Sequence, residues 1–124
     1  MAIVRIYTGD DGRSHFQDIE PEFHPVDGGW PIDGDAVIQA EGGILLRRFD
    51  PNRSHPWHSA PGRVCVFTVS GAVEIEVGDG TKRRIGPGDI LIAEDITGQG
   101  HYTRELGDEP RISMFVPIGT DVGG

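Results

Sequence analysis

"RVCVFTVSGAVEIEVGDGTKRRIGPGDILIAE", residues 63–94, decides the fold, because short apolar runs in it are separated by turn residues. Val73, Ile75 and Val77 alternate with charged residues and therefore share one face of a strand. The Gly-Asp-Gly sequence at 78–80 supplies the positive φ that a tight hairpin turn needs. The stretch predicts consecutive antiparallel strands joined by short turns.

The rest of the chain continues this pattern. Runs rich in Val, Ile and Phe recur with turn signals between them, and no long segment has helical spacing. This predicts an all-β sandwich or barrel of mostly antiparallel strands. The Pro- and Gly-rich segment 20–35 is expected to be a covering loop. Strands are expected at residues 2–7, 36–40, 43–49, 63–70, 72–78, 81–85, 89–94, 101–106 and 111–118.

Length, charge and cysteine content bound the class of protein. A chain of 124 residues suits one domain. The net charge of −9 argues against a nucleic-acid partner. No apolar run approaches the ~20 residues of a membrane-spanning helix, and the N-terminus has no signal-peptide pattern, so no membrane partner is expected. Cys65 is the only cysteine and is expected to be buried, which fits a cytoplasmic location.

Two segments resemble the paired motifs of the cupins. "HSAPGRVCVFTVSG" (58–71) resembles the end of the first motif and places His58 at its second histidine. "GPGDILIAEDITGQGH" (86–101) resembles the second motif and ends in His101. The sequence is most similar to small single-domain cupins that carry Glu-Asp-x-Thr-Gly-x-Gly-His, here "EDITGQGH" at 94–101.

This resemblance implies a double-stranded β-helix, that is, a cupin or jelly-roll barrel, with both histidines at its mouth. The expected division within one domain is N-terminal strands and covering loop at 1–39, barrel at 40–118 and C-terminal tail at 119–124. The resemblance also implies a homodimer and a small-molecule ligand.

The sequence departs from the cupin motifs at the residues that usually bind metal. His55 and His58 are spaced one residue wider than the His-x-His pair of the family. Val64 stands where the family has a metal-binding glutamate, Ile96 replaces a proline, and Glu105 occupies the asparagine position. The departures weaken the expectation of the usual metal site.

Two histidines in an apolar cup suit acid–base chemistry, because histidine's ordinary pKa of about 6.5 lets one ring accept a proton while another donates. We therefore predict an enzyme of the isomerase, lyase or cyclase type that uses His58 and His101. Asp95 is predicted to orient one imidazole; alternatively, it caps the turn that begins at Asp95.

Neighbouring residues are expected to contact a substrate. Val64 and Val66 are expected in the apolar wall, together with Ile92 and either Phe67 or Phe115. Arg47 and Arg48 must face opposite sides of a strand, and Arg48 is the candidate to bind a substrate carboxylate. Trp57 forms either a stacking wall for the substrate or a plug at the barrel end.

Two alternatives stay open. One is a metal-dependent oxygenase or lyase in which His55, His58 and His101 hold Fe, Mn, Ni or Zn. His55 reaches this site only through a specific bend, since Pro56 is expected to prevent a regular strand. The other is a non-catalytic metabolite-binding cupin. His15 and His24 lie outside the two motifs. They are expected either to belong to a lid over the barrel mouth or to be exposed on the surface.

Overall fold

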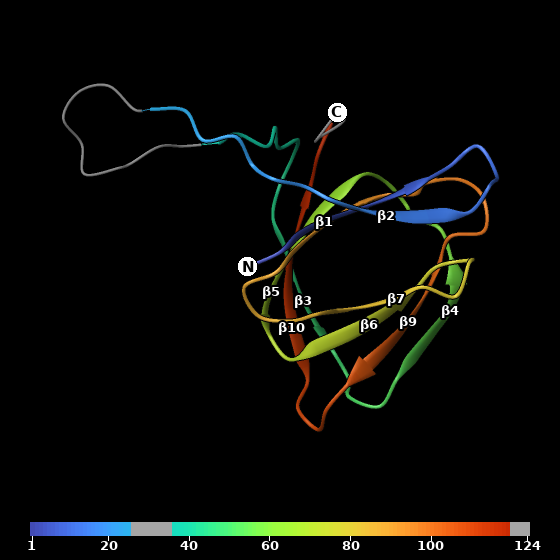
Figure 1. Cartoon of the computed structure of the whole chain (residues 1–124). Coiled ribbons are helices and arrows are strands. Elements are labelled where there is room, and N and C mark those ends of the chain that lie inside the picture. The colour runs from blue at the N-terminus through green and yellow to red at the C-terminus, as the bar shows by residue number, and fades with distance from the viewer. Residues whose placement is uncertain (26–35, 120–124) are drawn as a thin grey trace.

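The computed structural model describes residues 1–25 and 36–119, which form ten β-strands and no helix (Figure 1). The strands are β1 (Ile3–Thr8), β2 (Ser14–Asp18), β3 (Leu45–Phe49), β4 (Ser54–His58), β5 (Val64–Ser70), β6 (Ala72–Glu76), β7 (Lys82–Ile85), β8 (Ile90–Glu94), β9 (His101–Leu106) and β10 (Arg111–Pro117). None of the described residues belongs to a helix long and apolar enough to cross a membrane.

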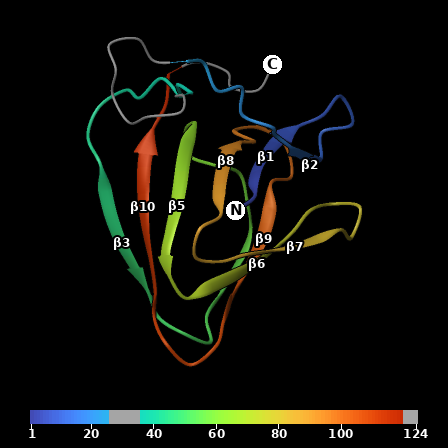
Figure 2. The same ribbon diagram turned by 60° about the vertical axis from the view of Figure 1, so that its left-hand side comes forward.

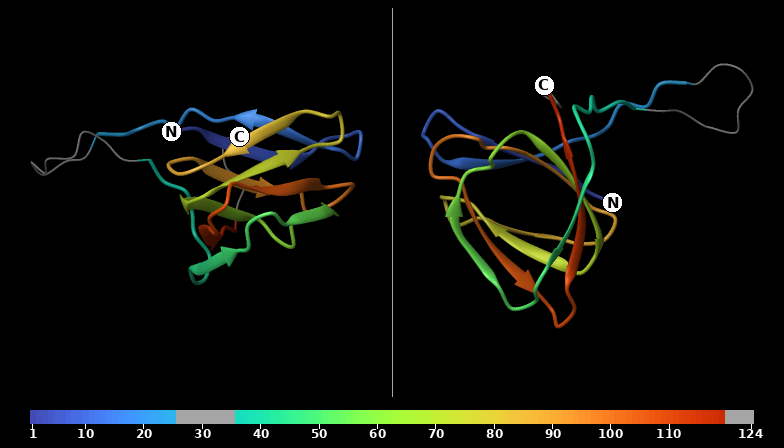
Figure 3. Two further views of the ribbon diagram at one scale, coloured as in Figure 1. Left: turned by 90° about the horizontal axis from the view of Figure 1, so that it is seen from below. Right: turned by 180° about the vertical axis from the view of Figure 1, so that it is seen from behind.

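The strands form two facing sheets. The larger has six strands in the order β2-β1-β8-β5-β10-β3, and the smaller has four in the order β4-β9-β6-β7 (Figure 2). Every pairing is antiparallel except that of β1 with β8. Seen from behind, the two sheets surround a common interior, as in a jelly-roll barrel (Figure 3). The predicted all-β, mostly antiparallel fold is confirmed.

The interior core follows from side-chain alternation. Val73, Ile75 and Val77 are all buried, as the sequence predicts. They pack in one cluster with residues of the larger sheet, among them Ile6 and Val66. Fully burying a side chain such as Ile75 stabilises the fold by roughly 1.5–3 kcal/mol. This cluster holds the two sheets together.

The other face of the six-stranded sheet carries a second apolar cluster. Cys65 and Ile92 belong to it, together with the partly buried Phe67. Because successive strand residues point to opposite faces, these three side chains point away from the barrel interior. The expectation that Ile92 would line the interior is therefore wrong. Of the two alternatives Phe67 and Phe115, Phe115 lines the interior, and so does Phe49.

Three local elements differ from the sequence prediction. The stretch 36–40 forms no strand and contributes one isolated bridge, between Ala40 and Ile118. β2 was not expected, because its sequence, Ser-His-Phe-Gln-Asp, is largely polar. β4 was not expected because it contains Pro56; the proline is tolerated where β4 pairs irregularly with β9.

The N-terminal strands are part of the barrel wall. β1 lies between β2 and β8 in the larger sheet, so residues before position 40 share that sheet with the motif-bearing strands. Of the expected covering loop, residues 26–35 lie outside the described residues, as do residues 120–124 of the tail.

Candidate functional site

An irregularity in β4 turns two histidines to the same side. His55 pairs with Thr103 and His58 with His101, so three steps along β4 match two along β9. One extra residue in a strand is a β-bulge, and it resets the alternation of side chains. His55 and His58 would face opposite sides of a regular strand, but both line the barrel interior.

The interior contains a cavity of about 180 Å³ between the two sheets. Most of its wall is apolar, with contributions from Val64, Val66, Val73, Ile75, Leu91 and Phe115. Its polar lining consists mainly of His55, His58, His101, Thr103, Arg47 and Arg111. The cavity is therefore an apolar cup with a small set of basic groups, which is typical of sites for small organic molecules.

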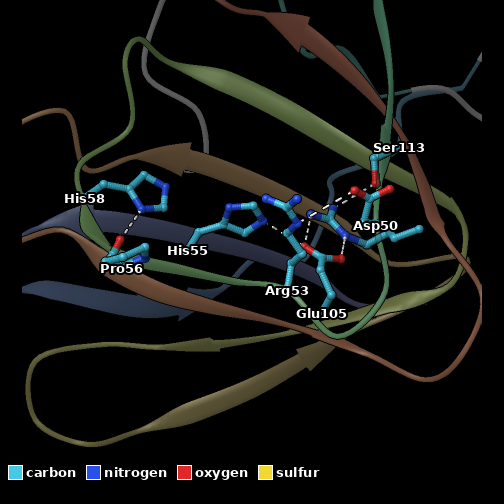
Figure 4. Close-up of polar contacts among 8 residues, drawn as sticks. Asp50, Arg53, His55, Pro56, His58, Glu105 and Ser113 are labelled. Carbon is cyan, nitrogen blue, oxygen red and sulfur yellow. Dashed lines mark hydrogen bonds and ion pairs between the residues drawn. The ribbon is translucent and has the colours of Figure 1, made fainter.

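His58 and His101 come together at this cavity. Their ring centroids lie 4.6 Å apart and the ring planes are tilted by 58°. His101 is buried, whereas His58 is exposed. His58 Nδ1 lies 2.7 Å from the Pro56 carbonyl oxygen (Figure 4). Because a carbonyl only accepts, Nδ1 of His58 donates and its Nε2 stays available for a ligand.

Asp95 fixes the second imidazole. Its Oδ2 lies 2.6 Å from His101 Nδ1 and accepts a second hydrogen bond, also of 2.6 Å, from the Ser14 hydroxyl. Asp95 is fully buried, and Ser14 comes from β2 on the larger sheet. Since the carboxylate accepts from Nδ1, Nε2 of His101 is also available for a ligand. Asp95 thus makes the contact with His101 that the predicted orienting role requires.

A second polar group lies beside the cavity, around Glu105. Arg111 donates to Glu105 through Nε at 2.7 Å and through Nη2 at 2.9 Å, and both side chains are buried. Nη1 of Arg111 donates to Ser113 at 3.0 Å. His55 Nε2 lies 3.3 Å from Glu105 Oε2, so the bulge directs His55 to this group (Figure 4).

Sequence reasoning missed Arg111. It begins β10, whose remaining residues are apolar except for Ser113, and nothing at its position in the sequence distinguishes it from an ordinary surface arginine at a strand end. Glu105 gave a signal as a charged residue in the asparagine position, but its partner was not apparent.

Two predicted substrate contacts are corrected. Arg47, not Arg48, lines the cavity, because β3 pairs with β10 so that Arg47 is opposite the buried Ser113. Trp57 does not line the cavity. It lies in the bulge and packs against Tyr102, with ring centroids 6.2 Å apart, so it is neither a stacking wall nor a plug inside the barrel.

The remaining residues of interest are also placed. Val64 and Val66 line the cavity as predicted. His15 binds Asp11 at 2.9 Å in the β1–β2 region and does not line the cavity, and His24 is exposed. Burial raises the pKa of the Cys65 thiol to about 11, which makes it a poor nucleophile at neutral pH.

The residues do not fit a three-ligand metal centre. A catalytic zinc ion takes three protein ligands, and iron in the two-histidine centres needs a carboxylate as the third. His58 and His101 offer two ring nitrogens, His55 is directed to Glu105, and none of the described residues that line the cavity carries a carboxylate. Within residues 1–25 and 36–119, no three His, Cys, Asp or Glu side chains converge in a way that would hold a metal ion. The His55, His58 and His101 ligand set is therefore not assembled.

Comparison with known proteins places this architecture. Residues 45–117 match the sequence profile of the family described as Cupin domain. Among curated proteins, none matches the sequence. The fold is similar to that of an uncharacterised conserved protein with a double-stranded β-helix domain from Klebsiella pneumoniae. The two chains are 22% identical with a TM-score of 0.51, over 82% of this chain and 87% of the other.

A second solved structure, a conserved protein of unknown function from Streptococcus pyogenes, is more distant. It is 17% identical with a TM-score of 0.47, and the match covers 81% of this chain and 96% of the other. At these identities the likeness to the Klebsiella protein concerns the fold alone.

Proposed function

Because this chain belongs to the cupin domain family, whose profile matches residues 45–117, we propose that its barrel binds a small organic molecule and transfers protons on it. The reaction is an isomerisation, elimination or cyclisation, and it uses His58 and His101. The observation that carries the proposal is the contact of these two rings, 4.6 Å between centroids, at a cavity whose wall is mostly apolar.

The hydrogen bonds of the two rings divide the roles. Nε2 of His58 is the base, because Nδ1 donates its hydrogen to the Pro56 carbonyl and Nε2 is left as the acceptor. Nε2 of His101 is the acid, because Asp95 accepts the Nδ1 hydrogen and leaves Nε2 as the ring atom from which a proton can pass to the ligand. A substrate proton passes to His58 while His101 protonates a second position on the same molecule. Because the two rings are in contact, the proton gained by His58 can then pass to His101, which returns both rings to their starting states.

The apolar wall supports this chemistry. Val64, Val66 and Leu91 line the cavity and exclude water from part of it, which strengthens the polar interactions at the histidines. Val64 supports the chemistry in a second way, because its side chain is apolar. Among the described residues that line the cavity, no carboxylate is present to pair with Nε2 of either histidine. The rings are left free to exchange protons with a ligand.

Solvent exchange tests the proposal without knowledge of the natural substrate. A set of small enolisable ketones and oxo acids is incubated in D2O, and NMR follows the replacement of C–H by deuterium. The wild-type protein is expected to accelerate exchange for some members. His58→Ala and His101→Ala should each lower that rate by about 10²–10⁴-fold.

His15→Ala is the matched control. His15 also contacts a carboxylate, Asp11, but lies outside the cavity, so this variant should exchange at the wild-type rate. Exchange that is equally fast in the wild type and in His101→Ala, or no faster than without protein across the whole set, would contradict the proposed proton transfer.

A further inference from the structure

The charge of the cavity wall is opposite to that of the chain as a whole. The chain carries a formal net charge of −9. Of the described residues that line the cavity, none is acidic, whereas Arg47, Arg111 and three histidines are basic. A wall of one sign attracts ligands of the other sign. The contrast therefore indicates an anionic ligand.

The two arginines are not equivalent. Arg111 is buried and neutralised by Glu105, which accepts two of its hydrogen bonds. It also stacks on the Phe49 ring, with Cζ 4.0 Å from the ring centroid. Its charge is compensated by Glu105, and its orientation is fixed by these hydrogen bonds and by the Phe49 ring. Arg111 is therefore a fixed part of the wall rather than the group that binds an anion.

Arg47 has no such partner among residues 1–25 and 36–119. Its guanidinium Cζ lies 4.5 Å from the centroid of the Phe115 ring, which also lines the cavity. Across the part of the chain that the structure describes, no carboxylate forms an ion pair with Arg47. Arg47 is exposed, so an anion that binds it keeps part of its hydration and loses little on desolvation.

We infer that the ligand of this cavity is a small organic carboxylate with an apolar body. Its carboxylate pairs with the planar Arg47 fork, to which a carboxylate can form two parallel hydrogen bonds. Its apolar part lies against Phe115 and Val64, and its other end reaches the rings of His58 and His101. This inference rests on the proposed function and names the substrate class for it.

The test compares ligands that differ only in charge. Aliphatic and aromatic carboxylic acids of four to eight carbons, each paired with its neutral primary amide, are titrated by ligand-observed NMR. The wild type is expected to prefer the acid in pairs that fit the cavity. Arg47→Gln should lower the affinity for those acids by about tenfold and leave the affinity for the amides unchanged.

Arg48→Gln is the control, because it removes the same charge from the adjacent residue, which does not line the cavity. It should bind both members of each pair like the wild type. Arg47→Lys should retain part of the preference, since it keeps the charge but loses the fork. The inference is overturned if no acid is preferred over its amide, or if Arg47→Gln and Arg48→Gln have equal effects.

These outcomes are separable from the proposed proton transfer. Carboxylate preference without deuterium exchange would contradict the chemistry and leave the ligand class standing. Deuterium exchange without carboxylate preference would contradict the ligand class and leave the proposed proton transfer standing. His101→Ala should lose exchange yet keep the preference for acids.

Discussion

Glu105 holds the guanidinium of Arg111 through two hydrogen bonds, 2.7 Å to Nε and 2.9 Å to Nη2, with both side chains buried beside the cavity. Removing one member of a buried ion pair leaves the other as an uncompensated charge. Glu105→Leu or Arg111→Met alone should therefore lower the free energy of unfolding by about 3–5 kcal/mol. Urea titration measures this quantity.

The double variant Glu105→Leu/Arg111→Met removes both charges. It should be more stable than the less stable of the two single variants, because no unpaired charge remains. If the two single losses simply add in the double variant, the pair is not energetically coupled and this account of Glu105 is wrong.

Asp95 is expected to act on the chemistry through His101. Asp95→Asn keeps the size of the side chain but removes the negative charge beside Nδ1. The rate of deuterium exchange should fall by about 10–100-fold, while carboxylate affinity at Arg47 stays within about twofold. Ser14→Ala, which removes only the other hydrogen bond to Asp95, should have the smaller effect.

Gly100, the residue before β9, allows the chain to approach the end of β4 closely at His58. It has a φ of 78°, and a Cβ at this position would overlap the backbone carbonyl of His58. Gly100→Ala should separate the strands and shift the NMR signals of both His58 and His101. Gly80, with a φ of 87° and open space around its Cα, is the control.

Gly80→Ala introduces only the strain of a non-glycine residue at positive φ, which costs about 1–3 kcal/mol. Gly100→Ala has that strain and the overlap, so its loss of unfolding free energy should be the larger. Equal losses in the two variants would show that the approach of His58 to Gly100 is not tight.

The reactivity of Cys65 tests its position in the outer cluster. Burial raises its pKa from 9.0 to about 11, so at pH 8 the folded protein has about a hundredfold less thiolate than an exposed cysteine would have. Alkylation by iodoacetamide should be slow in the native protein and should accelerate at least that much in urea. Rapid alkylation of the folded protein would contradict the burial.

Asp89 ties the start of β1 to the turn before β8. Its carboxylate accepts hydrogen bonds of 3.0 Å from the backbone amides of Gly86 and Ala2, and these bonds lower its pKa below 3.8. The carboxylate therefore stabilises the fold above its unfolded pKa of 3.8, and the contribution is lost as the pH falls through the lower folded value.

Asp89→Asn should consequently be less stable than the wild type at pH 7, and the difference should shrink as the pH falls below about 4. Unfolding free energies of the two proteins at pH 3–7 measure it. A difference that is constant over this range would mean that the ionised carboxylate is not what stabilises the turn.

The fold was accessible from the sequence because its signals are local. Alternation along Val73, Ile75 and Val77 and the turn glycines depend only on neighbouring residues, and the two cupin-like motifs fixed the class of barrel. β2 was not accessible: its polar residues form a strand only because β1 offers an unpaired edge. Long-range pairing of this kind leaves no trace in composition.

Parts of the site depended on strand phase, which a sequence does not settle. The prediction of Arg48 instead of Arg47 is wrong by one residue, and so is that of Ile92 instead of Leu91, because each step along a strand exchanges the two faces. The partnership of Arg111 with Glu105 joins two strands across a turn and could be found only from the three-dimensional arrangement.

The bulge in β4 also bears on how such chains should be recognised. A motif defined by a fixed spacing does not match His-x-x-His where it requires His-x-His. The β-bulge nevertheless accommodates the additional residue, so that both rings lie on the same wall of the cavity. Searches keyed to fixed intervals would discard such chains. Templates that compare where the imidazoles end up in space would keep them.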